Sequence, residues 1–189
     1  MFTIILFALI VAGTAYGMSE HAENRNYEYH GPAGFDLDRY LGRWYEIARF
    51  DHRFERGLDY VTAEYIMNDD GTIRVMNRGC DRDSGRLRET GGKAKTTSMP
   101  GHLRVSFFWL FYSDYDILAL GDNYEWVLIG SSSPKYLWIM SRTPTLPSEQ
   151  LEHILNIARE RGYDTSKLLY PVQRPGPSAR QPSAAALQH

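Results

Sequence analysis

The chain has 189 residues, which suits one well-filled domain and is short for two. Its 21 basic and 23 acidic residues nearly balance and form no basic stripe, so the composition gives no sign of a nucleic-acid partner. The single cysteine, Cys80, excludes an intrachain disulfide. Aromatic residues make up 13% of the chain, which favours β structure with large side chains that pack together or line a cavity.

Residues 1–17 are predicted to be an export signal. An apolar run from Phe2 to Ala12 precedes a group of small residues, and this run is too short to predict a membrane span. No Lys or Arg precedes it, so an uncleaved anchor or a different start codon stays open. Thr14 stands where a bacterial lipoprotein signal carries its cysteine, so we expect no covalent lipid anchor of that kind.

Residues 18–34 are polar and show no periodicity, so they are interpreted as a linker or as an arm laid over the mouth of the barrel predicted below. His21 and His30 in this stretch are interpreted as solvated loop residues, and we expect no metal site. Residues 35–41 are predicted to form a short helical turn across the barrel end, with Asp36 as its N-cap.

The first predicted strand covers residues 41–50, because its side chains alternate between two faces. The charged stretch 51–58 is predicted to be a long loop at the open end of the barrel, and loops of this size in a tight meander tend to be functional. A bend or bulge is predicted at Gly91 and Gly92. Further strands are predicted at 59–67, 72–81, 86–97, 102–108, 115–121, 124–130 and 136–142.

Eight short strands without a helix between them indicate an all-β fold, an eight-stranded antiparallel up-and-down β-barrel. Its interior would hold one small ligand. Ser148 is predicted to cap an amphipathic helix that Gly162 ends and that packs outside the barrel. A ninth strand over residues 168–172 is one possible interpretation of the sequence. Residues 174–189 have the composition of a disordered tail.

Several motifs resemble those of the lipocalin family. Gly42-x-Trp44 near the start of the domain resembles the first family signature, and Ser141-Arg142-Thr143-Pro144 resembles the third. The second signature is degenerate, because Asp122 matches while Tyr124 comes one place late. With three further stretches, the chain looks most like the bacterial lipocalins of the outer-membrane lipoprotein type, which are apolipoprotein D-like. Those stretches are Asn77-Arg78-Gly79, Val105-Ser106-Phe107-Phe108 and Tyr136-Leu137-Trp138-Ile139.

The resemblance covers residues 35–173 and implies a lipocalin barrel with one helix. It implies that Arg142 stacks over Trp44 at the closed end, so that Gly42, Trp44, Asp122 and Arg142 form a structural signature. It further implies storage or transport of a lipophilic ligand, with fatty acids or lysophospholipids the leading class, during envelope maintenance or stress. No cofactor is expected.

The implied location is the periplasm or the periphery of the outer membrane, and an extracellular location stays open. Peripheral membrane association and a homodimer are both compatible with the resemblance.

Counting by twos from Trp44, and matching the later strands to the family, gives the side chains expected to point inward. Glu46 and Asp116 share this inward parity, and as buried carboxylates they need partners or a wet mouth. The alternative is that the inward side chains fill a dry core. The predicted ligand-binding residues are Ala48, Phe50, Val105, Phe107, Leu118, Val127, Ile129, Trp138 and Met140.

Two other functions stay open. One is binding of a non-lipid hydrophobic molecule such as haem, a pigment or a signalling molecule. The other is catalysis, because a few lipocalins are enzymes and one of them uses a cavity cysteine as its nucleophile. Cys80 has the wrong parity if Val75 and Asn77 face inward, and the chain has no Gly-x-Ser-x-Gly motif. We therefore expect no catalytic residues and no enzymatic activity.

Overall fold

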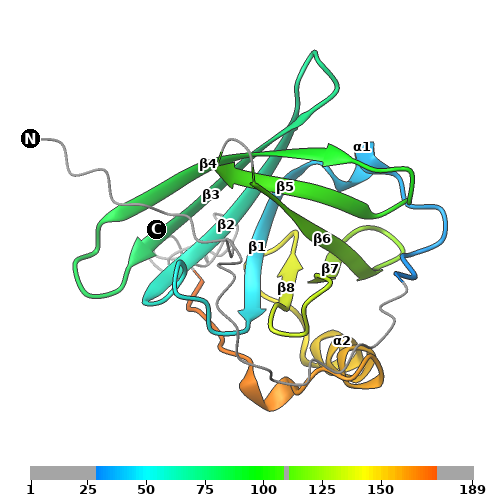
Figure 1. The fold of residues 1–189 in the computed structure, drawn as a ribbon. Coiled ribbons are helices and arrows are strands. Elements are labelled where there is room, and N and C mark those ends of the chain that lie inside the picture. The colour runs from blue at the N-terminus through cyan, green and yellow to red at the C-terminus, as the bar shows by residue number, and fades with distance from the viewer. Residues whose placement is uncertain (1–28, 109–110, 174–189) are drawn as a thin grey trace, which may run out of the picture.

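Eight antiparallel strands close into a barrel in chain order within residues 29–108 and 111–173, the part of the chain that the computed structural model describes (Figure 1). The barrel closes because β8 pairs back onto β1, which confirms the predicted fold class. The strands are β1 (Gly42–Arg49), β2 (Leu58–Met67), β3 (Ile73–Asp81), β4 (Leu87–Thr96), β5 (His102–Phe108), β6 (Phe111–Leu120), β7 (Trp126–Gly130) and β8 (Trp138–Ser141).

A short helix, α1 (Leu37–Tyr40), covers one end of the barrel. Asp36 is its N-cap as predicted, because the Asp36 carboxylate accepts hydrogen bonds from the backbone N–H groups of Asp38 (2.9 Å) and Arg39 (3.3 Å). Tyr40 is fully buried beneath this turn, and its carbonyl accepts a hydrogen bond of 2.8 Å from Trp44 Nε1. The turn therefore closes the barrel around the indole of Trp44.

Arg142 completes this closed end. Its guanidinium carbon lies 3.8 Å from the centroid of the Trp44 ring, which confirms the predicted stacking. Gly42 has φ +91°, and a Cβ there would lie 3.4 Å from Arg142 Nη1. A glycine at this position therefore allows both the left-handed backbone and the close approach of the guanidinium.

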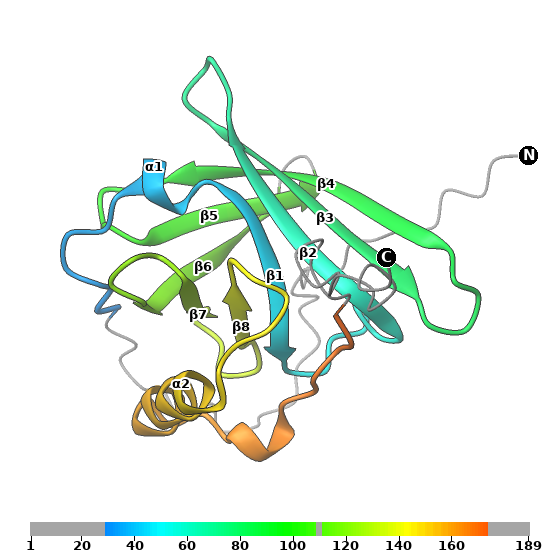
Figure 2. The same ribbon diagram turned by 180° about the vertical axis from the view of Figure 1, so that it is seen from behind.

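The helix α2 (Ser148–Glu160) packs on the outer face of the barrel (Figure 2). Its buried residues, Ile154, Leu155 and Ala158, join an outer hydrophobic core between the helix and the sheet. The predicted capping role of Ser148 is wrong. Pro147 occupies the N-cap position, and no side chain caps the helix there.

The chain after α2 forms a short 3-10 helix, η1 (Thr165–Lys167), and returns to β1. A ninth strand is absent from this described segment, because Arg49 and Leu169 form only an isolated antiparallel bridge. No helix in residues 29–108 and 111–173 is long and apolar enough to span a bilayer.

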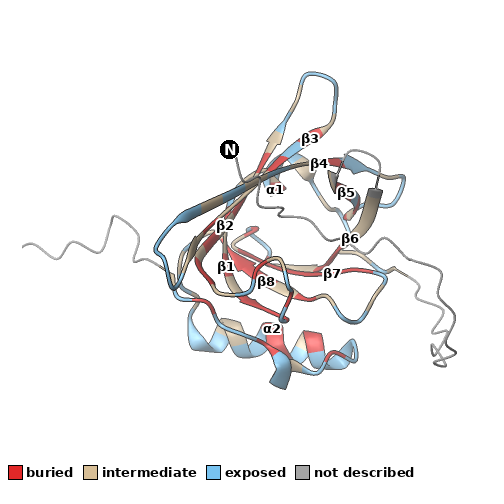
Figure 3. Ribbon diagram, turned by 60° about the vertical axis from the view of Figure 1, so that its left-hand side comes forward, coloured by how far each residue is buried: buried red, intermediate tan, exposed pale blue. Residues whose placement is uncertain are grey.

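The described residues contain two hydrophobic cores. One lies inside the barrel around Trp44, and the other lies between the barrel and α2. Figure 3 shows buried residues on the strands that face α2 and on the helix itself. Every residue of β7 is buried, because that strand has one core on each side.

Of the bend or bulge predicted at Gly91 and Gly92, the bulge is wrong in the pairing of β3 with β4. β3 and β4 pair without a register shift from Ile73↔Ala94 to Cys80↔Leu87. Gly92 serves close packing instead, because a Cβ there would lie 2.6 Å from the ring of Phe107.

The predicted export signal at 1–17 and the predicted tail at 174–189 lie outside the described residues, as does most of the predicted arm. Within its described part, the Tyr29 hydroxyl donates to the carbonyls of Ile117 (3.0 Å) and Pro100 (3.1 Å). These contacts place Tyr29 beside the β4–β5 turn, at the same end of the barrel as α1 and not across the open mouth.

Candidate functional site

The barrel encloses a cavity of about 480 Å³, within the range of roughly 300 to 1,000 Å³ that is usual for sites that bind small molecules. The residues 51–57 and 131–137, which connect strands, contribute to its open end, opposite α1. Much of its wall is apolar or aromatic. That part of the lining includes Phe54, Leu58, Val61, Ala63, Tyr65, Val75, Val105, Phe107, Tyr115, Ile129, Tyr136, Trp138 and Met140.

Five of the nine predicted ligand-binding residues line this cavity: Val105, Phe107, Ile129, Trp138 and Met140. Val127 lies inside the barrel as part of the inner core, but it is fully buried and does not line the cavity.

The predicted inward orientation of Ala48, Phe50 and Leu118 is wrong. All three belong to the outer core beneath α2. In β1 the register shifts between Glu46 and Ala48, where the pairing with β8 skips Ile47. This bulge reverses the alternation, so the residues after it face the opposite side from that counted from Trp44.

Asp116 is also misplaced by the inward prediction. In β6 the inner core holds Ile117, so its neighbours Asp116 and Leu118 face outward. Asp116 is fully buried, and one of its carboxylate oxygens lies 2.5 Å from His102 Nδ1. Its partner is therefore a histidine on the outer face of the barrel.

Glu46 does line the cavity, as predicted, and it belongs to a buried cluster with Arg49 and Glu55. Arg49 Nη1 donates to Glu46 Oε1, and Arg49 Nη2 donates to the backbone carbonyl of Glu55 at 2.7 Å. Glu55 Oε2 lies 3.8 Å from Arg49 Nε and accepts a hydrogen bond of 3.1 Å from Trp138 Nε1. The cluster thus holds two carboxyl groups around one guanidinium.

Burial changes the proton affinity of both carboxyl groups. Desolvation raises the pKa of Glu46 to about 8, and the nearby Glu55 carboxylate raises it while Arg49 lowers it. Desolvation also raises the pKa of Glu55, against the hydrogen bond from Trp138 and the charge of Arg49. At neutral pH the cluster therefore holds a proton that its two carboxyl groups share.

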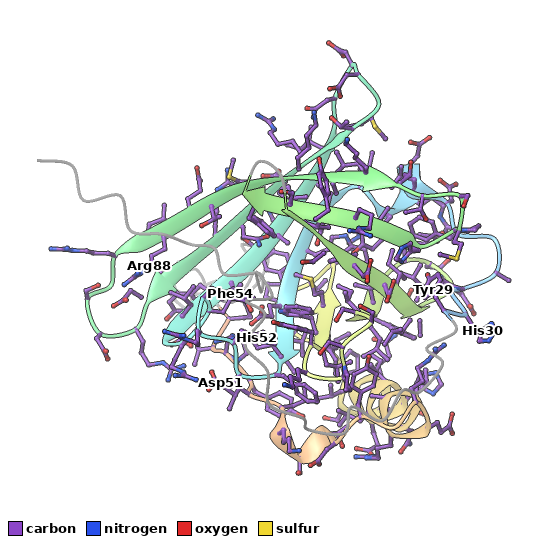
Figure 4. All side chains as sticks on the ribbon, viewed as in Figure 1. Tyr29, His30, Asp51, His52, Phe54 and Arg88 are labelled. Carbon is purple, nitrogen blue, oxygen red and sulfur yellow. The ribbon has the colours of Figure 1, made fainter. Side chains whose placement is uncertain are left out.

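Aromatic rings pack beside this cluster at the open end of the cavity. His52 is buried and stacks on Phe54 (ring centroids 5.3 Å apart) and on Tyr136 (4.9 Å), and Figure 4 shows His52 and Phe54 side by side. The ring centroid of Trp138 lies 4.7 Å from that of His52, with the two rings tilted. Burial and the charge of Arg49 lower the pKa of His52 to about 4, so its imidazole is neutral at physiological pH.

Three tyrosine hydroxyls meet toward the closed end. The Tyr115 hydroxyl lies 2.5 Å from that of Tyr40 and 2.7 Å from that of Tyr65. Tyr65 and Tyr115 line the cavity, and burial raises the pKa of all three hydroxyls. This end of the cavity therefore presents neutral hydroxyl groups.

Cys80 does not line the cavity, whereas Val75 and Asn77 do, as the predicted parity requires. The described residues contain no group of three or more His, Cys, Asp or Glu side chains arranged to hold a metal ion. Asp122, the remaining signature residue, is exposed, and its backbone carbonyl accepts a hydrogen bond of 3.2 Å from Arg39 Nη2.

Sequence reasoning missed Arg49, His52, Glu55, Tyr65 and Tyr115. For His52 and Glu55 a signal existed, because the loop that carries them was predicted to be functional.

The fold and the cavity define a closed β-barrel protein with an internal cavity. The Lipocalin-like domain model matches residues 35–173, and the chain belongs to the lipocalin family, whose members generally bind small hydrophobic molecules. The chain is 49% identical over 144 residues to "Outer membrane lipoprotein Blc" of Escherichia coli K12, covering 75% of this chain and 81% of that protein.

It is also 30% identical over 184 residues to apolipoprotein D of Mus musculus, covering 89% of this chain and 94% of that one. Among solved structures, lobster apocrustacyanin A1 matches with a TM-score of 0.60 at 20% identity, covering 74% and 80% of the two chains. This last similarity supports the fold alone.

Proposed function

We propose that this protein binds and carries a single-chain lipophilic ligand in the barrel cavity, with fatty acids and lysophospholipids as the leading classes. The observation that carries the proposal is the cavity of about 480 Å³ with a largely apolar wall. Each methylene that leaves water for such a wall contributes about 0.8 kcal/mol to binding. No chemical reaction is needed for this role.

The two ends of the cavity suit an amphiphile. Val105, Ile129 and Met140 supply apolar wall inside the barrel. Arg88, on the strand that follows the β3–β4 turn, and the exposed Lys135 belong to the open-end lining, where a polar headgroup can stay hydrated. An acyl chain that points inward with its headgroup near water satisfies both ends.

The proposed setting is the bacterial envelope, after export, because relatives are named outer membrane lipoproteins. Maintenance of the envelope under stress and peripheral contact with a membrane are part of this proposal. A homodimer is a further proposal that size-exclusion chromatography with light scattering would test.

Two variants test the cavity with a matched substitution. Val105→Trp places a large ring where the cavity wall is, whereas Val172→Trp adds the same ring at a position that is 56% exposed. Native mass spectrometry and solvent extraction of detergent-free protein should recover fatty acid or lysophospholipid from the Val172→Trp variant. Much less should come from Val105→Trp at equal circular dichroism.

Binding of a fluorescent fatty acid should follow the same order. An empty wild-type protein that also takes up no fluorescent fatty acid would contradict the proposal. Recovery of haem or a coloured ligand from the wild type would favour the non-lipid alternative instead.

A further inference from the structure

We propose that Glu46 and Glu55 form a subsite for a positively charged nitrogen, so that the cavity prefers single-chain amphiphiles with an amine over those with a carboxylate. This inference rests on the proposed function and names the ligand chemistry that the same cavity takes. It is carried by the geometry of the buried cluster and by the rings that surround it.

Each of the two carboxyl groups has one oxygen to spare. Arg49 occupies Glu46 Oε1, and Trp138 Nε1 occupies Glu55 Oε2. Within the described residues, neither Glu46 Oε2 nor Glu55 Oε1 accepts a hydrogen bond, although Glu46 is only 1% exposed and Glu55 only 7%. These two oxygens are not among the fully buried polar atoms that lack a partner, and both residues line the cavity, so a ligand in the cavity can donate a hydrogen bond to them.

The charges around the cluster leave a negative excess once both carboxyl groups ionise. Arg49 is the one cation in contact with them among the described residues, and its charge is shared between the two. His52 is neutral, as shown above. Asp51 and Asp59, which also feel the charge of Arg49, are paired with Arg56 and Arg82, so these outer pairs add little net charge. A ligand cation would therefore balance the cluster, whereas a ligand carboxylate would add to the excess.

Aromatic side chains lie beside the same cluster. Trp138, which contacts Glu55 directly, and Tyr136 stack with their ring centroids 6.0 Å apart, and both line the cavity with Phe54. Aromatic rings attract a cation through their quadrupoles, most strongly where water is excluded. Carboxylates and rings together make a site that a cationic nitrogen fits better than a neutral or anionic group.

Binding of such a cation also has a consequence for protons. The proton that the two carboxyl groups share at neutral pH becomes unfavourable when a fixed positive charge arrives, so it should leave for the solvent. Uptake of an amine at pH 7 is therefore coupled to release of a proton, and uptake of a neutral ligand is not.

The test compares dodecylamine, dodecanol and dodecanoate, which share one chain and differ in the charge of the head. Isothermal titration calorimetry at pH 7, in two buffers of different ionisation enthalpy, gives the affinity and the number of protons released. Wild-type protein should bind dodecylamine at least about tenfold more tightly than dodecanol, because a charge-assisted hydrogen bond adds to the binding of the chain. Dodecanoate should bind more weakly than dodecylamine, and only dodecylamine should release a proton.

Two variants locate the effect. Glu46→Gln keeps an oxygen that accepts from Arg49 but removes the titratable group, so the preference for the amine over dodecanol and the proton release should both disappear. Glu152→Gln is the same change on the exposed face of α2, where Glu152 pairs with Arg159, and it should leave all three affinities unchanged.

The outcomes separate the two proposals. If dodecanol binds but dodecylamine gains nothing over it, or dodecanoate binds best, the cation subsite is wrong and the carrier function stands. The subsite is equally wrong if Glu46→Gln keeps the full preference and the proton release. If none of the three ligands binds, both proposals fail. The ligand series on wild-type protein decides the question even if a variant does not fold.

Discussion

Removal of the Arg142 side chain should weaken the closed end of the barrel more than its partial exposure suggests. The Arg142 guanidinium lies over the Trp44 ring and also donates to four backbone carbonyls of α1, β1 and the β6–β7 connection. The acceptors are Arg39 O (2.6 Å), Arg43 O (2.9 Å), Tyr40 O (3.0 Å) and Tyr124 O (3.3 Å).

The expected cost follows from these contacts. A cation–π contact at a half-buried site contributes about 1 kcal/mol. The bonds to Tyr40 O and Tyr124 O are half-buried, and each contributes about 1 kcal/mol net, whereas those to Arg39 O and Arg43 O are exposed, so water can replace them. Arg142→Ala should therefore lower the free energy of unfolding by about 3 kcal/mol. Arg142→Lys should recover only part of this, because a single ammonium cannot reach all four acceptors.

Urea unfolding followed by tryptophan fluorescence measures this difference, with circular dichroism to show that the variants keep the fold. Arg39→Ala is the control, since Arg39 makes a comparable cation–π contact with Tyr124 (4.2 Å) and one exposed bond to Asp122 O. Its cost should stay below about 1 kcal/mol. If Arg142→Ala costs no more than Arg39→Ala, the guanidinium does not hold the closed end together and the reasoning is refuted.

Two further changes test other parts of the barrel. Gly92→Ala should cost about 1 to 3 kcal/mol of folding free energy in the same urea assay, because its Cβ would lie 2.6 Å from the Phe107 ring and 2.9 Å from the carbonyl of Ser106. Gly91→Ala should be nearly neutral, since the nearest atom is 3.8 Å away, and equal losses would contradict the close-packing role of Gly92. The folded-state pKa of Glu46 is about 8, above its ordinary value of 4.5. Between these pH values the native state holds a proton on Glu46 that the unfolded state has lost, so the free energy of unfolding should fall as pH rises from about 5 to about 8. Glu46→Gln should remove most of this slope in unfolding curves taken at several pH values, and an unchanged slope would show that another group causes it.

The topology of the barrel could be predicted from the sequence because turn residues and alternation mark each strand locally. Turns such as the one at Gly71 separate strands that then pair with their neighbours in order. The closed end was equally predictable, since the family signature pairs Arg142 with Trp44 and the stacking requires only those two side chains. The existence of α2 followed from its apolar stripe, although its cap did not.

The face that each strand presents was harder to predict where both faces are buried. In β6, Ile117 lies in the inner core and Leu118 in the outer one. Because both neighbours are apolar, the sequence does not show which of the two faces the inside of the barrel. In β7 the same ambiguity covers the whole strand. Alternation identifies the inward face only where the outward face meets water, and α2 removes that contrast.

The bulge in β1 links the main errors of orientation to the chemistry of the cavity. Without it, Glu46 would face inward and Arg49 outward, and the carboxyl group would stand in the barrel without a cation. The bulge at Ile47 turns Ala48 toward α2 and brings Arg49 inward onto Glu46. A buried carboxylate with no nearby cation in the predicted register is therefore itself a sign that the register is wrong, because burying an unpaired charge costs far more than a bulge does. In this barrel the single extra residue supplies the guanidinium that makes two carboxyl groups tolerable in an apolar cavity.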